Sequence, residues 1–211
     1  SSLFFAAIVY NLSLKRKTAL VCGSTQGIGK ASALELALLG ANVVLVARNE
    51  EMLKGVIKEL DTTQGQKHHY IAADFSKPEE LKEKVLSFLK TNPTVNILIN
   101  NTGGPPGGLA IDAKPEEFIQ AFTNHLICNQ VLAQCVVEGM KKSGYGRIIN
   151  IISTSVKMPI KGLGVSNTIR AAVANWAKTL ANELASFGIT VNNILPGATN
   201  TTRLNSLMEI R

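Results

Sequence analysis

Thr18-Ala-Leu-Val-Cys-Gly-Ser-Thr-Gln-Gly-Ile-Gly-Lys30 is the stretch of sequence that decides the fold. Its first five residues, from Thr18 to Cys22, form a short apolar run that predicts a fully buried strand. Three glycines follow, and the amphipathic stretch from Lys30 to Leu39 predicts a helix that ends at Gly40. A strand, a glycine-rich turn and a helix in this order are typical of a dinucleotide-binding unit.

Each of the three glycines has a physical role in such a turn. Gly23 lets the chain leave the strand tightly, Gly27 lets the backbone approach a pyrophosphate, and Gly29 lets the helix pack close to the sheet. The N–H groups and the positive dipole end of the helix then attract the phosphates. A plain glycine-rich turn is the alternative interpretation, because the spacing is G-x-x-x-G-x-G instead of G-x-G-x-x-G. We expect the following residues of the turn to contact the cofactor: Gly23, Ser24, Thr25, Gln26, Gly27, Ile28 and Gly29.

The composition indicates one globular domain in a cytoplasmic protein. The chain has 211 residues, of which 45% are hydrophobic and 18% charged, which is enough for a sizeable core. The cysteines, Cys22, Cys128 and Cys135, have no metal-binding spacing and indicate reduced thiols, so we expect no metal site. The net charge of +7 is scattered and forms no basic face, so we expect no nucleic-acid partner.

Residues 1–13 are expected to form an N-terminal arm outside the domain, which would span residues 14–211. The apolar run from Leu3 to Tyr10 is too short to cross a bilayer, which needs about 20 residues. It also lacks the basic start and the small-residue cleavage site of a signal peptide. We therefore expect neither a membrane segment nor a leader in this arm.

Apolar strands alternate with helices along the rest of the chain. Further strands are expected at residues 42–46, 69–73, 96–100, 147–152 and 189–195. Further helices are expected at residues 48–60, 79–90, 115–140 and 166–187. Because each strand is apolar on both faces, the sequence predicts an α/β fold of the Rossmann type. Its doubly wound parallel sheet would have the strand order 3-2-1-4-5-6 and helices on both faces.

The tips of the second and third strands indicate which dinucleotide binds. NAD-binding units carry a carboxylate about 20 residues beyond the glycines, which holds the ribose 2′-hydroxyl. Here Arg48 occupies the tip, and a guanidinium can pair with a 2′-phosphate, with Ser24 and Thr25 as further donors. Arg48 therefore favours NADP(H) over NAD(H), although a solvated residue at a helix start is the alternative. Asp74, at the end of the third strand, could accept from an adenine amino group or stabilise a turn.

Further motifs make the chain similar to the short-chain dehydrogenases/reductases. Asn100-Asn-Thr-Gly103 resembles the family's Asn-Asn-Ala-Gly turn, and Pro196-Gly197 followed by Thr201 resembles its Pro-Gly-x-x-x-Thr segment. The likeness runs from about Leu14 to Arg203, and among family members the bacterial 3-oxoacyl-acyl-carrier-protein reductases look most similar. The resemblance favours the adenine contact for Asp74. It also adds these residues to the cofactor site: Asn100, Asn101, Thr102, Gly103, Pro196, Gly197 and Thr201.

The resemblance implies a catalytic set of Ser, Tyr, Lys and Asn for delivering a hydride from a nicotinamide to a carbonyl carbon. Only the Ser is kept, as Ser153. The Tyr position falls on Ser166, the Lys position on Arg170, and the Asn position on His125, with Asn124 one residue away. A Ser hydroxyl is a much weaker acid than a phenol, and Arg does not release its proton, so the chemistry of this site departs from the family pattern.

Ser166 and Arg170 still share one helix face, where a fixed positive charge could stabilise a developing alkoxide. His125 could supply a proton through water. We therefore expect an NADP(H)-dependent reductase or alcohol dehydrogenase for a small-molecule carbonyl or alcohol, with Ser153, Ser166, Arg170 and His125 at its centre. The alternative is a cofactor-binding homologue without turnover, which acts as a redox sensor or as a structural partner.

The resemblance also implies a homodimer or homotetramer, formed by the helices at residues 115–140 and 166–187. Family members continue past the position of Arg211 into a substrate-covering segment and a further strand. We therefore expect this sequence to be short of the family's C-terminal segment.

Overall fold

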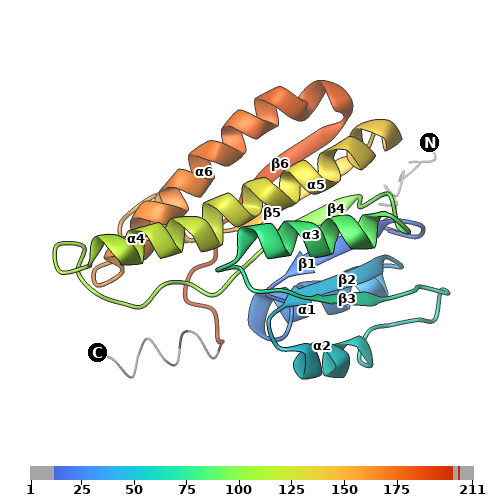
Figure 1. Cartoon of the computed structure of the whole chain (residues 1–211), viewed down its shortest axis with the longest axis horizontal. Helices are drawn as coiled ribbons and strands as arrows, with labels where there is room; N and C mark the ends of the chain where they lie inside the picture. Colours follow the sequence, from blue (N-terminus) through green and yellow to red (C-terminus); the bar gives the residue numbers. More distant parts are fainter. Residues whose placement is uncertain (1–11, 202–203, 205–211) are drawn as a thin grey trace, which may run out of the picture.

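The computed structural model describes residues 12–201 and residue 204. In this part of the chain, six parallel strands form one sheet in the order β3-β2-β1-β4-β5-β6 (Figure 1). This order confirms the predicted doubly wound topology. The strands are β1 Thr18–Cys22, β2 Asn42–Ala47, β3 His69–Ala72, β4 Ile97–Asn100, β5 Gly146–Ile151 and β6 Ile189–Ile194.

Helices lie on both faces of the sheet, as predicted (Figure 1). Helices α1 and α2 pack on one face, and α3, α5 and α6 pack on the other. The helices are α1 Gly27–Leu38, α2 Glu50–Ile57, α3 Pro78–Leu89, α4 Pro115–Phe122, α5 Cys128–Ser143 and α6 Gly164–Leu184. No helix in the described part of the chain is long and apolar enough to span a membrane. Residues 1–11 of the predicted N-terminal arm and residues 205–211 lie outside the described part.

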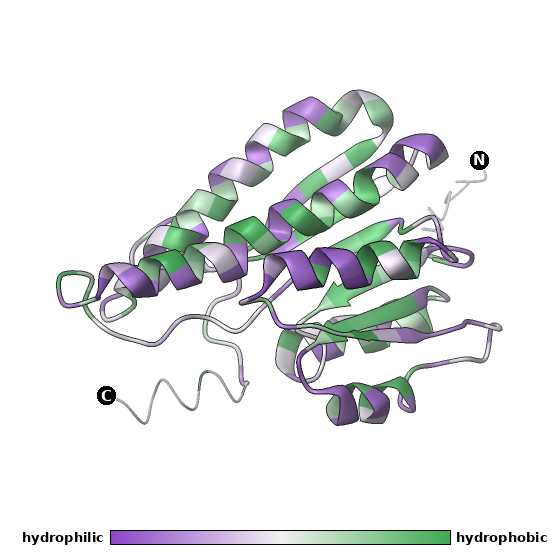
Figure 2. Cartoon of the chain, in the orientation of Figure 1, coloured by the Kyte–Doolittle hydropathy of each residue, from purple (hydrophilic) through white to green (hydrophobic). Residues whose placement is uncertain are grey.

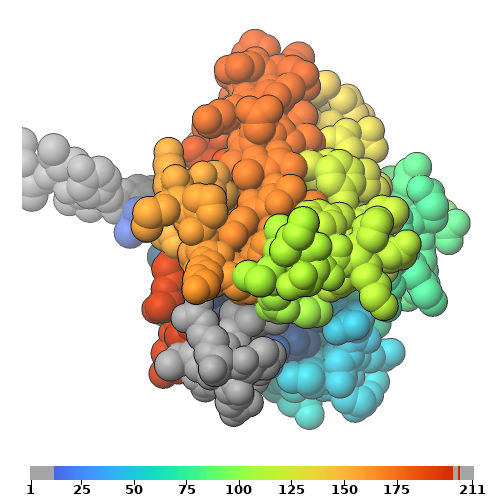
Figure 3. Space-filling model, turned by 90° about the vertical axis from the view of Figure 1, so that its left-hand side faces the viewer, coloured from blue at the N-terminus to red at the C-terminus, as the bar shows by residue number. Residues whose placement is uncertain are grey.

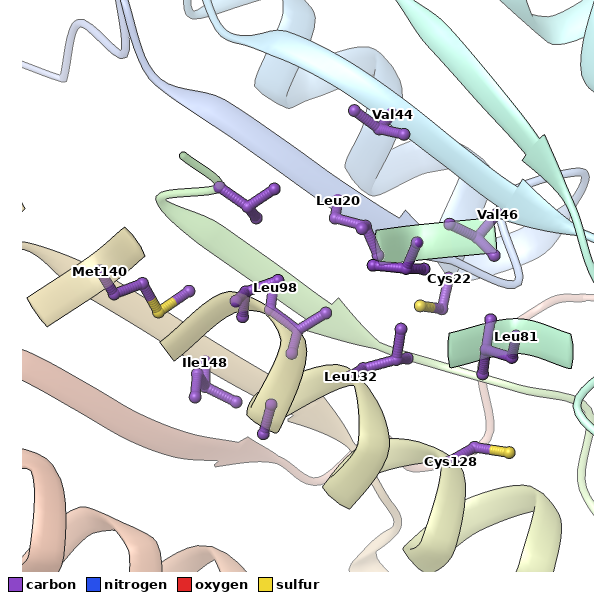
Figure 4. Packing of buried hydrophobic residues seen from close by; sticks show 14 of the residues in the cluster. Leu20, Cys22, Val44, Val46, Leu81, Leu98, Cys128, Leu132, Met140 and Ile148 are labelled. Carbon is purple, nitrogen blue, oxygen red and sulfur yellow. The ribbon is translucent and has the colours of Figure 1, made fainter. Parts of the chain in front are cut away.

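Successive residues of each strand point to opposite faces of the sheet, so an apolar layer forms on each side. Leu20, Leu98 and Ile148 come from neighbouring strands and pack with Leu132 and Met140 of α5 (Figure 4). The residues that alternate with them on β1 and β4 point to the other face and pack against α1 and α2. Strands β1, β2 and β4 are accordingly hydrophobic in Figure 2, while much of the surface of α2 and α3 is hydrophilic. Burial on both faces explains why these three strands read as continuous apolar runs.

The helix predicted at residues 115–140 differs from expectation at its centre. Residues Thr123–Ile127 form a π-helical segment between α4 and α5. Such a segment accommodates one extra residue, and the 3.6-residue hydrophobic spacing carries no signal for it. It contains His125, whose side chain is buried. The other long helix starts at Gly164, two residues before the predicted start, and ends in the 3₁₀ turn Ala185–Phe187.

Two loops are tied together at the carboxyl end of the sheet. The Gly108 N–H donates to the Gly162 carbonyl at 2.7 Å, and the Gly164 N–H donates to the Gly108 carbonyl at 3.0 Å. The segment that follows β4 is therefore joined to the segment that precedes α6. Figure 3 shows these yellow-green and orange segments side by side on this face. In a doubly wound sheet, this edge is where ligands bind.

Candidate active site

The turn after β1 is too tight for any residue except glycine at two positions. Gly23 has a φ of +58°, and a Cβ there would lie 2.6 Å from Nδ2 of Asn101. A Cβ on Gly29 would collide with the Gly23 carbonyl oxygen. Asn101, which follows β4, donates through Nδ2 to the carbonyls of Cys22 and Gly23, both at 3.3 Å. The Asn101 side chain therefore fastens the glycine turn to the tip of the adjacent strand.

The first turn of α1 is open toward solvent. Gln26 occupies the N-cap position, no side chain caps the helix, and the first turn carries no acidic residue. Gly27 has a φ of +54°, and a Cβ there would lie 3.4 Å from the Thr201 side chain. Thr25 is half-buried beside this end, and Ile28 packs into the core under α1. Uncapped N–H groups and a positive dipole end are features that attract anions.

Ser24 lies differently from the prediction that its hydroxyl reaches a phosphate. The residue is fully buried, and Oγ donates to the Val46 carbonyl at 3.5 Å. This contact links the glycine turn to β2. Of the two hydroxyls proposed as phosphate donors, the structure leaves that of Thr25 near the surface.

Arg48 and Asp74 are neighbours at the tips of β2 and β3. Arg48 is exposed, and the Asp74 carboxylate accepts the Ser76 N–H at 2.9 Å. This backbone hydrogen bond and, to a smaller degree, the guanidinium of Arg48 hold the pKa of Asp74 below its ordinary value. Asp74 therefore stabilises its own turn, which was one of the two roles considered for it. Arg48 therefore puts a positive group at the tip of β2, where we expect the 2′-phosphate from the sequence.

Arg170 is anchored at the end of β5. Its Nε donates to Oγ of Ser166 at 3.2 Å, which places the predicted pair together on α6. Its Nη1 donates to the carbonyls of Ile151 and Ile152, at 3.1 and 3.2 Å. These bonds hold a permanent positive charge against the carbonyl end of the strand, because guanidinium stays protonated at any working pH.

Ser153 lies two residues beyond the end of β5 and caps the short 3₁₀ turn Thr154–Val156. Its Oγ accepts the Ser155 N–H at 3.1 Å. A hydroxyl that accepts one hydrogen bond can still donate its own proton. Thr154 donates its N–H to the Pro196 carbonyl at 3.1 Å, which joins this turn to the segment after β6. Gly197 is exposed on that segment.

A small hollow lies between the ends of β4 and β5 and the helices α5 and α6. Predicted site residues from three separate segments line it. The end of β4 and the loop after it contribute residues 100–102, the π-helical segment contributes His125, and α6 contributes Arg170. Ser153 and Ser166 do not line the hollow. Ser153 follows the lining residue Ile152 in the sequence, and Ser166 accepts a hydrogen bond from the lining residue Arg170. Gly103 is exposed and also lies outside the lining. The hollow is lined by Asn100, Asn101, Thr102, His125, Asn129, Ile151, Ile152, Arg170 and Val173.

The family model described as short chain dehydrogenase matches residues 17–210. The chain belongs to this family. It is 32% identical over 198 residues to the 3-oxoacyl-acyl-carrier-protein reductase FabG of Vibrio cholerae, covering 94% of this chain and 80% of that protein. These findings confirm the family resemblance on which the sequence prediction was based.

Solved structures agree with this short-chain dehydrogenase over nearly the whole fold. YwfH, an NADPH-dependent reductase involved in bacilysin biosynthesis, is 28% identical, with a TM-score of 0.87 over 92% of this chain and 77% of that chain. The L-sorbose reductase of Gluconobacter frateurii, complexed with NADPH and L-sorbose, is 30% identical, with a TM-score of 0.86 over 92% of this chain and 73% of that one.

Three buried or half-buried asparagines of this short-chain dehydrogenase were missed by the sequence prediction. Asn129 lines the hollow from α5, while Asn150 and Asn193 lie on β5 and β6. A signal was present, because Asn150 and Asn193 interrupt or end apolar strand runs where an amide needs a partner. The partners become visible only when the strand register is known.

The other predictions about chemistry concern thiols and metals. Cys22, Cys128 and Cys135 are all free. Burial raises the pKa of the Cys22 thiol strongly and that of Cys128 to about 12, so both are protonated and unreactive at neutral pH. The described part of the chain contains no group of three or more side chains arranged to hold a metal ion.

Proposed function

We propose that this short-chain dehydrogenase is an NADP(H)-dependent oxidoreductase that interconverts a carbonyl and an alcohol on a small molecule. The observation that carries the proposal is the anchored Arg170–Ser166 pair at the carbonyl end of β5. It supports the proposal because the family resemblance assigns proton transfer to these two positions, and here they hold a hydroxyl beside a fixed positive charge. The similarity to FabG of Vibrio cholerae supports 3-oxoacyl thioesters as the first substrate class to test.

The residues of the glycine turn fit a phosphorylated dinucleotide. Glycine at positions 23 and 29 lets the turn close against Asn101 and the helix, and the uncapped N-terminus of α1 offers backbone N–H groups to a pyrophosphate. Arg48 is exposed at the next strand tip, where a guanidinium can pair with a 2′-phosphate in a bidentate manner. The NADPH named for YwfH and for the L-sorbose reductase supports the same choice over NAD(H).

The proposed chemistry divides between the cofactor and four side chains. A bound reduced nicotinamide supplies the hydride. Ser153 donates its hydroxyl proton in a hydrogen bond to the substrate oxygen, and the guanidinium of Arg170 stabilises negative charge that develops on that oxygen. Ser166, whose Oγ accepts from Arg170, and His125 in the hollow hold the proton path to the oxygen.

Titration of the full chain with NADPH, followed by fluorescence, tests binding, and loss of NADPH absorbance with ketones and 3-oxoacyl thioesters tests turnover. Ser153→Ala is expected to lower kcat at least about tenfold, which corresponds to about 1.4 kcal/mol of transition-state stabilisation. Ser153→Thr is the matched control, because it keeps both the hydroxyl and the cap on the 3₁₀ turn. Binding without consumption of NADPH on any substrate would instead support the cofactor-binding homologue without turnover.

We further propose that the protein is a cytoplasmic homodimer or homotetramer assembled through α4, α5 and α6. Ile119 and Phe122 of α4 are exposed apolar side chains at this surface, with 66% and 39% of their area accessible. The free cysteines support a reducing compartment. Light scattering on the full chain measures the mass directly, and Ile119→Glu together with Phe122→Glu is expected to shift it to that of a monomer.

A further inference from the structure

Three asparagine side chains form a continuous hydrogen-bonded ladder across β4, β5 and β6. The strand register pairs Asn100 with Asn150, and Asn150 with Asn193. Asn100 Nδ2 donates to Asn150 Oδ1 at 2.9 Å, and Asn150 Nδ2 donates to Asn193 Oδ1 at 3.0 Å. Asn193 Nδ2 then donates to the Ala174 carbonyl of α6 at 3.4 Å. The ladder therefore starts beside the hollow and ends on the backbone of α6.

The carbonyl at the end of the ladder fixes the direction of every amide in it. An Asn side chain has one donating and one accepting end of nearly the same shape, so its orientation is set by its partners. Because the Ala174 carbonyl can only accept, Asn193 must turn Nδ2 toward it and Oδ1 toward Asn150. Asn150 must then turn Oδ1 toward Asn100, which leaves Oδ1 of Asn100 at the free end.

The free end of the ladder is a buried acceptor. Asn100 is 2% exposed, and its Oδ1 accepts no hydrogen bond from any residue that the structure describes. A buried amide oxygen without a donor costs free energy, so this atom favours a ligand that brings an N–H or O–H. Asn100 lines the hollow together with His125 and Arg170, and the hollow has room for about one water molecule.

We propose that Asn193 and Asn150 are positioning residues, which present Oδ1 of Asn100 as the acceptor for a hydroxyl group held in the hollow beside His125 and Arg170. The hydroxyl belongs either to a water molecule or to a bound ligand, since both offer the same donor. The inference deepens the proposed function, because a hydroxyl fixed between these side chains lies on the proton path. The orientation of the three amides can be tested even if the protein turns over no substrate.

Two variants of Asn193 separate an orienting role from a merely structural one, and Asn193 does not itself line the hollow. Asn193→Asp keeps the direction of the ladder, because a carboxyl group accepts from Nδ2 of Asn150 whether or not it is protonated. Asn193→Leu has similar volume but no polar group, so the anchor is lost. Asn150 can then reverse and donate to Asn100, which turns Nδ2 of Asn100 toward the hollow.

Neutron diffraction from deuterated crystals of the full chain locates the amide deuterons and the hydroxyl. We expect the wild type and Asn193→Asp to show a deuteroxyl donating to Oδ1 of Asn100, and Asn193→Leu to show Nδ2 there instead. Crystals soaked with NADPH distinguish the two sources, because a ligand hydroxyl would replace the water. Nδ2 of Asn100 facing the hollow in the wild type would overturn the proposal, even if neither variant folds.

Kinetics supply the second measurement. Asn193→Leu is expected to lower kcat about tenfold with an unchanged KM for NADPH, whereas Asn193→Asp stays within about twofold of the wild type. If both variants changed kcat equally and the amides kept their orientation in both, the ladder would have only a structural role. That result would contradict an orienting role. If no substrate is turned over, the proposed function fails while the neutron result still decides the direction of the ladder.

Discussion

Replacing Gly29 with alanine is expected to destabilise the protein and to prevent tight NADPH binding. The new Cβ would collide with the Gly23 carbonyl oxygen and lie 2.7 Å from Nδ2 of Asn101. The carbonyl belongs to a backbone turn that Asn101 already holds in place, so the turn must open to relieve the collision. Overpacking of this kind costs about 1–3 kcal/mol. An opened turn also moves the first N–H groups of α1 away from the pyrophosphate.

Gly55→Ala is the matched control, because it makes the same chemical change in a helix with free space. Gly55 lies inside α2, and a Cβ there would meet nothing within 4 Å. Alanine in a helix interior is favoured over glycine by about 0.5–1 kcal/mol. In a chain of this size, 1 kcal/mol changes the Tm by about 2–4 °C. We therefore expect Gly29→Ala to lower the Tm by about 2–12 °C and Gly55→Ala to raise it by about 1–4 °C.

Differential scanning calorimetry measures both Tm values, and NADPH fluorescence measures the two affinities. Gly55→Ala should bind NADPH as the wild type does. If Gly29→Ala melted like Gly55→Ala and kept wild-type affinity, the close approach of α1 to the glycine turn could not be the reason for glycine at this position.

Four further predictions concern single groups. Arg48→Gln is expected to weaken NADPH binding about 10- to 100-fold, by removing a charge-assisted contact, and to leave NADH binding unchanged; equal losses for both coenzymes in parallel titrations would contradict the phosphate contact. Arg170→Met should lower kcat for ketone reduction more than Arg170→Lys does, because lysine keeps the charge, so equal rates in a steady-state assay would remove the electrostatic role. Asp74→Asn should make the free energy of unfolding fall less between pH 7 and pH 3 than it does in the wild type. The pKa of Asp74 is lowered in the folded state, so its contribution is complete above pH about 4 and is lost as the pH falls through that lower value; urea unfolding at pH 7 and pH 3 measures it. Cys22 and Cys128 should resist iodoacetamide at pH 8 until the protein unfolds, and mass spectrometry that found either one alkylated in the native state would contradict their burial.

Local sequence patterns were sufficient to predict the frame of the fold. The run from Thr18 to Lys30 contains its own strand, turn and helix, and the collision of a Cβ on Gly29 shows why that position needs glycine. Apolar strands alternating with helices predicted a doubly wound parallel sheet, and the order 3-2-1-4-5-6 is the one typical of a Rossmann-type dinucleotide-binding fold. The pairing of Ser166 with Arg170 was also visible, since residues four apart share a helix face.

Features that depend on register or on backbone detail could not be predicted from these patterns. The π-helical segment around His125 leaves no mark in a hydrophobic spacing that continues on either side of it. The inward orientation of Ser24 depends on the position of the Val46 carbonyl of β2 relative to the glycine turn. The amide ladder needs Asn100, Asn150 and Asn193 to fall at one level on three strands, and that level is set by sheet register.

The β-bridge between Gly108 and Leu163 joins the segment after β4 to the segment before α6. If either segment moves outward, the other must move with it, or two backbone hydrogen bonds must break. The positions of the two segments at the carboxyl end of the sheet are therefore coupled. A substitution that shifts the segment after β4 is expected to shift the segment before α6 as well.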